Sequence, residues 1–146
     1  MALQQRLATV DRIQKWEIQV QSESVLCSTD TEETLNHLFF ECNYSKTIWH
    51  KLLQWTGMQR QVRSWNEELV WLANITRSKH PRASILAFIF SATVYHVWME
   101  RNSRSFQQLK RTSIDRLKEI ALQLHIVGQR YSKWQNELDR LRGYPD

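Results

Sequence analysis

Apolar residues recur every three or four positions along most of the chain, which is the period of an amphipathic helix. The pattern predicts a first helix that runs toward Trp16 and a second helix from about Tyr44 to Trp55. Between them, apolar and polar residues alternate over 16–20, which predicts a short extended segment before a polar loop. Gly57 lies just past the second helix and suits a left-handed C-terminal cap.

Two further helices are predicted in the middle of the chain. Ser64 and Glu67 have the spacing of a capping box, in which a hydroxyl accepts the N3 amide hydrogen while a carboxylate reaches back. A helix should begin there and run to about Thr76. The residues expected to face inward are Trp65, Leu69, Leu72 and Ile75. Pro81 suits the first turn of the next helix, whose residues 85–98 are apolar on nearly all sides, so we expect it to form the centre of the fold.

A membrane span is the alternative for residues 83–99, which carry no formal charge. The stretch is shorter than the about 20 predominantly apolar residues that a span needs. It also contains polar side chains, among them Ser84, Ser91 and His96. We therefore expect no membrane partner.

The last predicted helix carries a heptad seam, with apolar residues alternately three and four positions apart. The seam residues are Leu117, Ile120, Leu124, Val127, Tyr131, Trp134, Leu138 and Leu141. Either the seam packs across the central helix of the same chain, or part of it pairs with a second chain to form a homodimer. Packing within the chain is favoured, because a small helical domain must bury each apolar stripe somewhere.

Composition favours long elements with few turns, because the chain has 3 Gly and 2 Pro among 146 residues. The scattered glycines form no loop that could hold a phosphate, and the acidic residues show no spacing typical of a two-metal site. We therefore expect no enzymatic activity and no small-molecule substrate. Two cysteines and the lack of an apolar stretch in the first 20 residues favour an intracellular protein, nuclear or cytoplasmic, that is not secreted.

An array of zinc-ligand type lies between the first two predicted helices. The spacing C-x2-C-x9-H-x4-C, with serine in place of the first cysteine, is formed by Ser24, Cys27, His37 and Cys42. Structural zinc sites use four ligands, and this array offers three soft ligands and a poor hydroxyl. Two interpretations stay open: a weakened zinc site, or two small buried cysteines near a hydrogen-bonded histidine.

The expected fold is mostly α, a small bundle of about five helices with a short, irregular, zinc-knuckle-like loop near the N-terminus. At this length we expect one domain over 1–146. It would consist of a knuckle-like region (7–56), a central helical region (57–109) and an amphipathic basic C-terminal helix (110–146).

Three segments carry longer motifs. Residues 9–16, TVDRIQKW, are similar to the pattern T-x-D-R-L-x-x-W-G. Residues 33–49, ETLNHLFFECNYSKTIW, are similar to E-T-x-x-H-L-F-F-x-C-x-Y-S-x-x-V/I-W, and residues 92–102, ATVYHVWMERN, to A-x-V-Y-x-I-W-x-E-R-N. Together they resemble the zinc-binding domain that follows the reverse transcriptase in plant LINE-type (non-LTR) retrotransposons. The resemblance covers most of the chain from Leu7 to about Phe106.

The resemblance implies that Cys27, His37 and Cys42 are zinc ligands, with zinc in a structural role. Ser24 stands where the family has its first cysteine, and Glu17 stands where it has glycine. These departures suggest a stand-alone or domesticated fragment with a degenerate zinc site. Exchanging a thiolate for a hydroxyl removes one ligand of four, so zinc binding would need a substitute ligand.

The resemblance and the charge distribution favour RNA or DNA as a partner. The chain carries a net charge of +5, and the residues after 100 hold 10 Lys and Arg against 5 Asp and Glu. The basic residues clustered around the start of the last predicted helix are Arg101, Arg104, Lys110, Arg111, Arg116 and Lys118. They predict weak, non-specific contact with phosphates, or else the solvated face of a helix. The alternative function is a protein-interaction module that uses the heptad seam.

Overall fold

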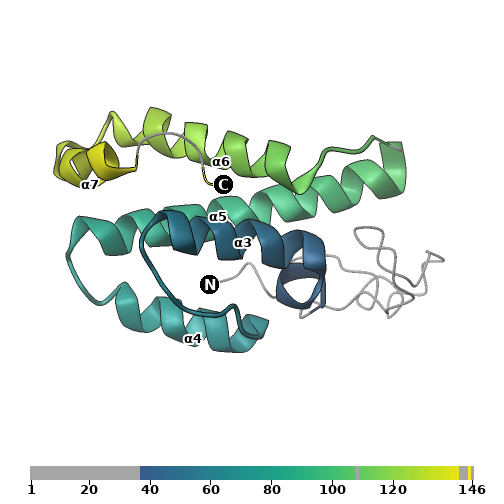
Figure 1. The fold of residues 1–146 in the computed structure, drawn as a ribbon, viewed down its shortest axis with the longest axis horizontal. Helices are drawn as coiled ribbons and strands as arrows, with labels where there is room; N and C mark the ends of the chain where they lie inside the picture. Colours follow the sequence, from purple (N-terminus) through teal and green to yellow (C-terminus); the bar gives the residue numbers. More distant parts are fainter. Residues whose placement is uncertain (1–36, 108, 142–144, 146) are drawn as a thin grey trace.

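The computed structural model describes residues 37–107, 109–141 and 145, and within them the chain is mostly α-helical (Figure 1). This confirms the predicted fold class. The elements are the π-helical turn η1 (His37–Glu41), α3 (Asn43–Trp55), α4 (Trp65–Ile75), α5 (Pro81–Asn102), the π-helical turn η2 (Ser103–Gln107), α6 (Ser113–Gly128), the short 3-10 helix η3 (Ser132–Trp134) and α7 (Gln135–Arg140). The predicted first helix and extended segment lie outside the described residues.

The boundaries of α3 and α4 follow the signals in the sequence. α3 ends at Trp55, and Gly57 has a φ of 85°, which confirms the predicted left-handed conformation. Ser64 caps α4, because its hydroxyl oxygen accepts a hydrogen bond from the Glu67 amide at 3.4 Å. The Glu67 carboxylate accepts a hydrogen bond from the same hydroxyl at 3.2 Å, so the structure contains one half of the capping box.

The central helix of the described fold is α5. It begins at Pro81 and ends at Asn102, beyond both ends of the apolar stretch seen in the sequence. α3 and α6 pack against it, and both run antiparallel to it (Figure 1). Residues Pro81–Gln107 have the length and apolarity of a membrane span, but 56% of their most apolar stretch is buried inside the fold. The buried core helix of a soluble protein can have the same length and apolarity.

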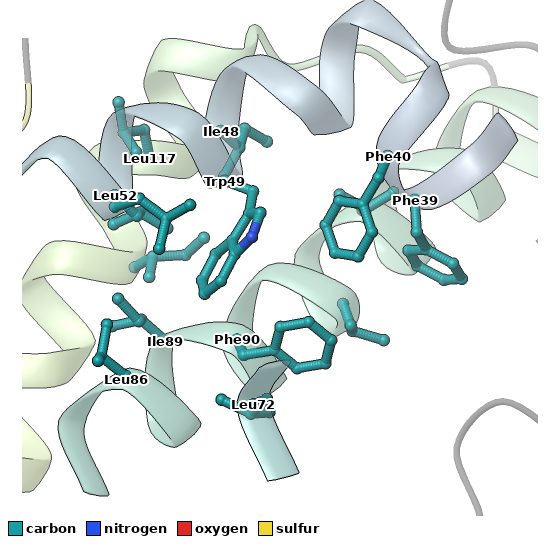
Figure 2. Close-up of a cluster of buried hydrophobic side chains, with 14 of the residues drawn as sticks. Phe39, Phe40, Ile48, Trp49, Leu52, Leu72, Leu86, Ile89, Phe90 and Leu117 are labelled. Atoms are coloured by element: carbon teal, nitrogen blue, oxygen red, sulfur yellow. The ribbon is translucent and has the colours of Figure 1, made fainter. Parts of the chain in front are cut away.

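An aromatic and aliphatic core lies between α3, α4 and α5 (Figure 2). Trp49 of α3 is fully buried and meets Phe90 of α5 edge-on, with ring centroids 5.3 Å apart. Trp65 at the start of α4 stacks on Phe40 with centroids 5.7 Å apart. Trp65 and Leu72 are buried as predicted, while the other two predicted inward positions of α4 are half-buried.

The prediction of one long C-terminal helix is wrong. α6 ends at Gly128, and after a turn the chain continues as η3 and α7. Gly128 permits this reversal, because a Cβ at that position would collide with the Leu138 side chain. Gln135 Nε2 donates a hydrogen bond to the Gly128 carbonyl at 2.8 Å, and His125 Nε2 donates to the Leu141 carbonyl at 2.8 Å. Close packing and these two bonds hold α7 against the end of α6.

The heptad seam is therefore used mainly within the chain. The seam residues that the fold buries are Leu117, Ile120, Leu124, Leu138 and Leu141. Val127 and Trp134 are half-buried, and Tyr131 in the turn is 49% exposed. Along the described part of the seam, no continuous apolar face remains for a second chain.

Candidate functional site

Two of the predicted zinc ligands lie at the ends of one π-helical turn. The Cys42 amide donates a hydrogen bond to the His37 carbonyl at 2.6 Å, which closes the turn η1. A hydrogen bond between residues five apart defines a π turn, so the H-x4-C spacing fits this geometry. Cys42 is fully buried and His37 is 7% exposed. The turn therefore brings the backbones of a buried histidine and a buried cysteine together just before α3.

Aromatic packing holds this turn against the core. Residues 38–40 are buried, and the Phe39 ring lies 4.9 Å from the Trp65 ring, measured between centroids. The Ser45 hydroxyl donates a hydrogen bond to the Cys42 carbonyl at 3.1 Å within the first turn of α3. These contacts with the core hold the backbone of the turn.

The chemistry of this pair fits half of a structural zinc site. Imidazole nitrogen and thiolate sulfur are common zinc ligands, and structural sites use four ligands. Cys27 and Ser24 lie outside the described residues. Within the part of the chain that the structure describes, no three His, Cys, Asp or Glu side chains are grouped so that they could hold a metal ion. Cys27, the remaining soft ligand of the array, is the first candidate for a further ligand.

Comparison with known proteins points to the same segment. Residues 1–49 match the family model described as zinc-binding in reverse transcriptase. The match covers a third of the chain and includes all four positions of the array. No curated protein and no solved structure matches the chain. The first third of the chain is therefore similar to this zinc-binding type, and it contains the buried turn.

The predicted phosphate-binding arginines surround a buried carboxylate. Glu100 of α5 is fully buried. Its carboxylate accepts hydrogen bonds from three neighbours: Arg104 Nε at 2.7 Å, the Arg111 amide at 2.8 Å and Arg116 Nε at 3.1 Å. Burial raises the pKa of Glu100, but the donors outweigh burial and bring the pKa below its usual 4.5. Glu100 therefore closes α5 onto α6 and onto the turn that precedes α6.

Only part of the predicted basic cluster faces solvent. Arg101 is 2% exposed and packs against aromatic rings, and Arg116 is 7% exposed. Arg111 forms an ion pair with a glutamate of α6, whereas Lys110 and Lys118 are exposed. Arg116 is engaged by the buried Glu100, and Arg101 is engaged by aromatic rings. Their burial argues against contact between these two side chains and phosphate.

A neutral histidine and a tyrosine extend this network. His96 is 1% exposed, with Nδ1 3.2 Å from Arg116 Nη1 and Nε2 3.0 Å from Gln123 Oε1. Arginine can only donate, so Nδ1 accepts and Nε2 carries the proton. Burial lowers the pKa of His96. The Tyr44 hydroxyl of α3 donates to the Arg111 carbonyl at 2.9 Å, and burial raises the pKa of Tyr44 to about 12. The network thus joins α3 to α5 and α6.

A second buried carboxylate joins α3 to α4. Glu68 is fully buried and accepts a hydrogen bond from Trp49 Nε1 at 3.2 Å. Arg60 Nη1 contacts both carboxylate oxygens, at 2.6 and 2.9 Å, and the Arg63 amide donates at 3.3 Å. Glu68 therefore fixes the connection between the two helices as well as the helices themselves.

The sequence analysis missed both buried carboxylates. Glu68 lies three residues after Trp65 and four before Leu72, which places it on the inward face of α4. Glu100 has Arg104 four residues after it, which is the spacing of an ion pair along a helix. Glu100 could therefore have been found from the sequence as an acidic residue in a mostly apolar helix with Arg104 one turn later.

Proposed function

We propose that this chain is a non-catalytic, zinc-binding-type domain derived from a plant LINE-type retrotransposon. The observation that carries the proposal is the match of residues 1–49 to the family described as zinc-binding in reverse transcriptase. Within that match, His37 and Cys42 share one buried turn. The sequence at 92–102 supports the narrower assignment to plant LINE-type elements. Its Glu100 has a structural role, because it links α5 to α6.

Zinc has a structural role in this proposal. His37 and Cys42 would hold it from a turn that the core already positions. When bound, zinc supplies a cross-link between the segment that carries Cys27 and the start of α3. A catalytic role would require an open coordination position and a general base, and the proposal assigns neither.

Metal content of the purified protein tests the zinc assignment. A Ser24→Cys variant restores the fourth family ligand, and we expect it to carry one zinc ion per chain. A Ser22→Cys variant adds a thiol outside the array and serves as the matched control. Zinc should be lost when Cys42→Ser is added to the Ser24→Cys variant. A Ser24→Cys protein that binds no zinc, or one that keeps its zinc when Cys42→Ser is added, would refute the assignment.

We also propose that the domain binds RNA or DNA inside the cell, weakly and without sequence specificity. The net charge of +5 supports contact with phosphates. Fluorescence anisotropy with a labelled single strand, at two salt concentrations, tests this. We expect binding that weakens steeply as salt is raised. No binding at the lower salt concentration would refute it.

A protein partner is the second candidate, and one observation favours it. Leu122 and Ile126 lie four residues apart on α6 and are 48% and 54% exposed. They form a small apolar face that is separate from the buried seam. Sedimentation at several protein concentrations would detect a homodimer through this face, and replacing both residues with Gln should then abolish it.

A further inference from the structure

Three hollows follow one another along the connection between α3 and α4. The first, of about 420 Å³, is lined by Lys46 and His50 of α3 and by Gln61 of the connection. The second, of about 470 Å³, shares His50 and Gln61 and adds Arg60. The third, of about 530 Å³, shares Arg60 and adds Trp71 of α4. Because neighbouring hollows share lining residues, we name the three together the α3–α4 groove; it is defined by Lys46, His50, Arg60, Gln61, Trp71 and Asn74.

The groove exists because α3 and α4 run in the same direction (Figure 1). After the end of α3, residues 56–64 must travel back along the helices before α4 can begin. The connection is fixed in this position by Glu68, which binds Arg60 and the Arg63 amide. The shape of the groove is therefore set before any ligand arrives.

The charges that line the groove are mainly positive. The cations Lys46, Arg60 and Arg63 line it beside the imidazole of His50, and the carboxylate among the lining residues, Glu67, pairs with Arg63 at 3.6 Å. Arg60 is held by the buried Glu68, whereas Lys46 forms no ion pair with any described residue. The pair between Arg63 and Glu67 is exposed on both sides, so solvent screens it and an anionic ligand can compete with it. The groove thus offers Lys46 and Arg63 to an anionic ligand.

One wall of the groove carries a flat stack. The Arg60 guanidinium lies over the Trp71 ring, 4.2 Å from its centroid, while Glu68 holds the Arg60 Nη1. Amide side chains stand on both sides of this stack, Gln61 in the first two hollows and Asn74 in the third. Cationic, amide and aromatic side chains therefore line the same groove.

A single-stranded nucleic acid has the chemistry that this groove would bind. Its phosphates need cations spaced along a groove, and its unstacked bases offer flat faces to aromatic or guanidinium groups. Base edges also offer donors and acceptors to amide side chains. A duplex buries its base faces, and an acidic peptide would leave the amides and the Arg60–Trp71 stack unused. The mixture of groups thus favours a single strand over both.

We propose that the α3–α4 groove is the binding surface for single-stranded nucleic acid. The proposal rests on the nucleic-acid function proposed above. It moves the contact surface from the basic cluster around α6 to the face of α3 that follows the His37–Cys42 turn. The zinc-type turn then directly precedes α3, the helix that lines part of the nucleic-acid surface.

Two double variants of the full chain locate the surface. Lys46→Gln with Arg63→Gln removes two exposed cations from the groove, and Lys110→Gln with Lys118→Gln removes two exposed cations elsewhere. Binding of a labelled single strand of about 12 nucleotides is measured by anisotropy between about 50 and 200 mM salt. The groove variant should weaken binding several-fold and flatten the slope of log K against log salt by roughly 1.4, at about 0.7 per lost phosphate contact. The control should keep the slope.

The outcomes separate the two proposals. Absence of binding by the unmodified protein refutes the nucleic-acid function and the groove together. Full binding with an unchanged salt slope in the groove variant refutes the groove alone, and loss of binding by the Lys110 and Lys118 variant would place the contact beside α6. Equal competition by a duplex or by an oligoglutamate peptide also overturns the choice of a single strand. Far-UV circular dichroism of both double variants checks that they fold, which is expected because all four residues are exposed.

Discussion

Replacing Glu100 by Gln should destabilise the fold strongly. The side chain is fully buried, and its carboxylate faces Arg104 and Arg116, whose side chains are 15% and 9% exposed. A glutamine of the same shape keeps one acceptor oxygen but turns an NH₂ group toward cationic donors. Breaking a buried ion pair by removing one partner costs about 3–5 kcal/mol, because the remaining charge stays buried without compensation. We expect a loss in this range, toward its lower end because Arg104 reaches solvent.

Urea unfolding followed by circular dichroism measures this loss, with Glu119→Gln as the matched control. Glu119 pairs with Arg111, and the two side chains are 34% and 44% exposed, so this pair should contribute only about 0–1 kcal/mol. A Glu100→Gln protein that loses less than about 1 kcal/mol would refute the reasoning. An Arg116→Met change made in the Glu100→Gln background should cost less than the same change in the natural chain, because its charge is no longer paired.

Three further predictions concern pH and glycine. His96 is buried and neutral with a pKa below 6.5, so its contribution to stability is present above pH 6.5 and is lost as the pH falls; His96→Gln should reduce the difference between urea midpoints at neutral and mildly acidic pH. Gly57→Ala should cost about 1–2 kcal/mol in urea unfolding, since φ is 85° there, and a loss near zero would contradict this. Gly128→Ala should lower the free energy of unfolding by only about 1 kcal/mol, because the Leu138 methyl group that it meets is the far end of a flexible side chain, and Leu138→Ala should relieve that overpacking in the double variant.

Local signals in the sequence were sufficient for the helices in the middle of the chain. Ser64 as a cap, Pro81 in a first turn and Gly57 with positive φ are each decided by a few neighbouring residues, and the structure agrees with all three. Burial of α5 also followed from its composition, because a helix that is apolar on nearly all sides has to lie inside.

Features that depend on contacts between residues distant in the sequence could not be predicted in this way. The heptad seam continues past Gly128 in the sequence, but the chain reverses there because Gly128 lies against Leu138, ten residues later. Likewise, the basic residues near Glu100 look like a phosphate-binding cluster when they are counted along the chain. Three-dimensional packing turns several of them toward one buried carboxylate, and only the fold reveals which cations remain exposed.

Metal removal should leave the helices intact, because protein contacts already hold α3 on two sides. Trp49 of α3 donates to the buried Glu68 of α4, and Tyr44 of α3 donates to the Arg111 carbonyl beside the Glu100 network. Small zinc fingers unfold without metal since they lack such a core. We therefore expect a chelator to strip zinc from a Ser24→Cys protein without removing its helical circular dichroism, while the urea midpoint falls because zinc binds the folded chain. Unfolding of the helices on chelation would show that the metal, and not the core, positions α3.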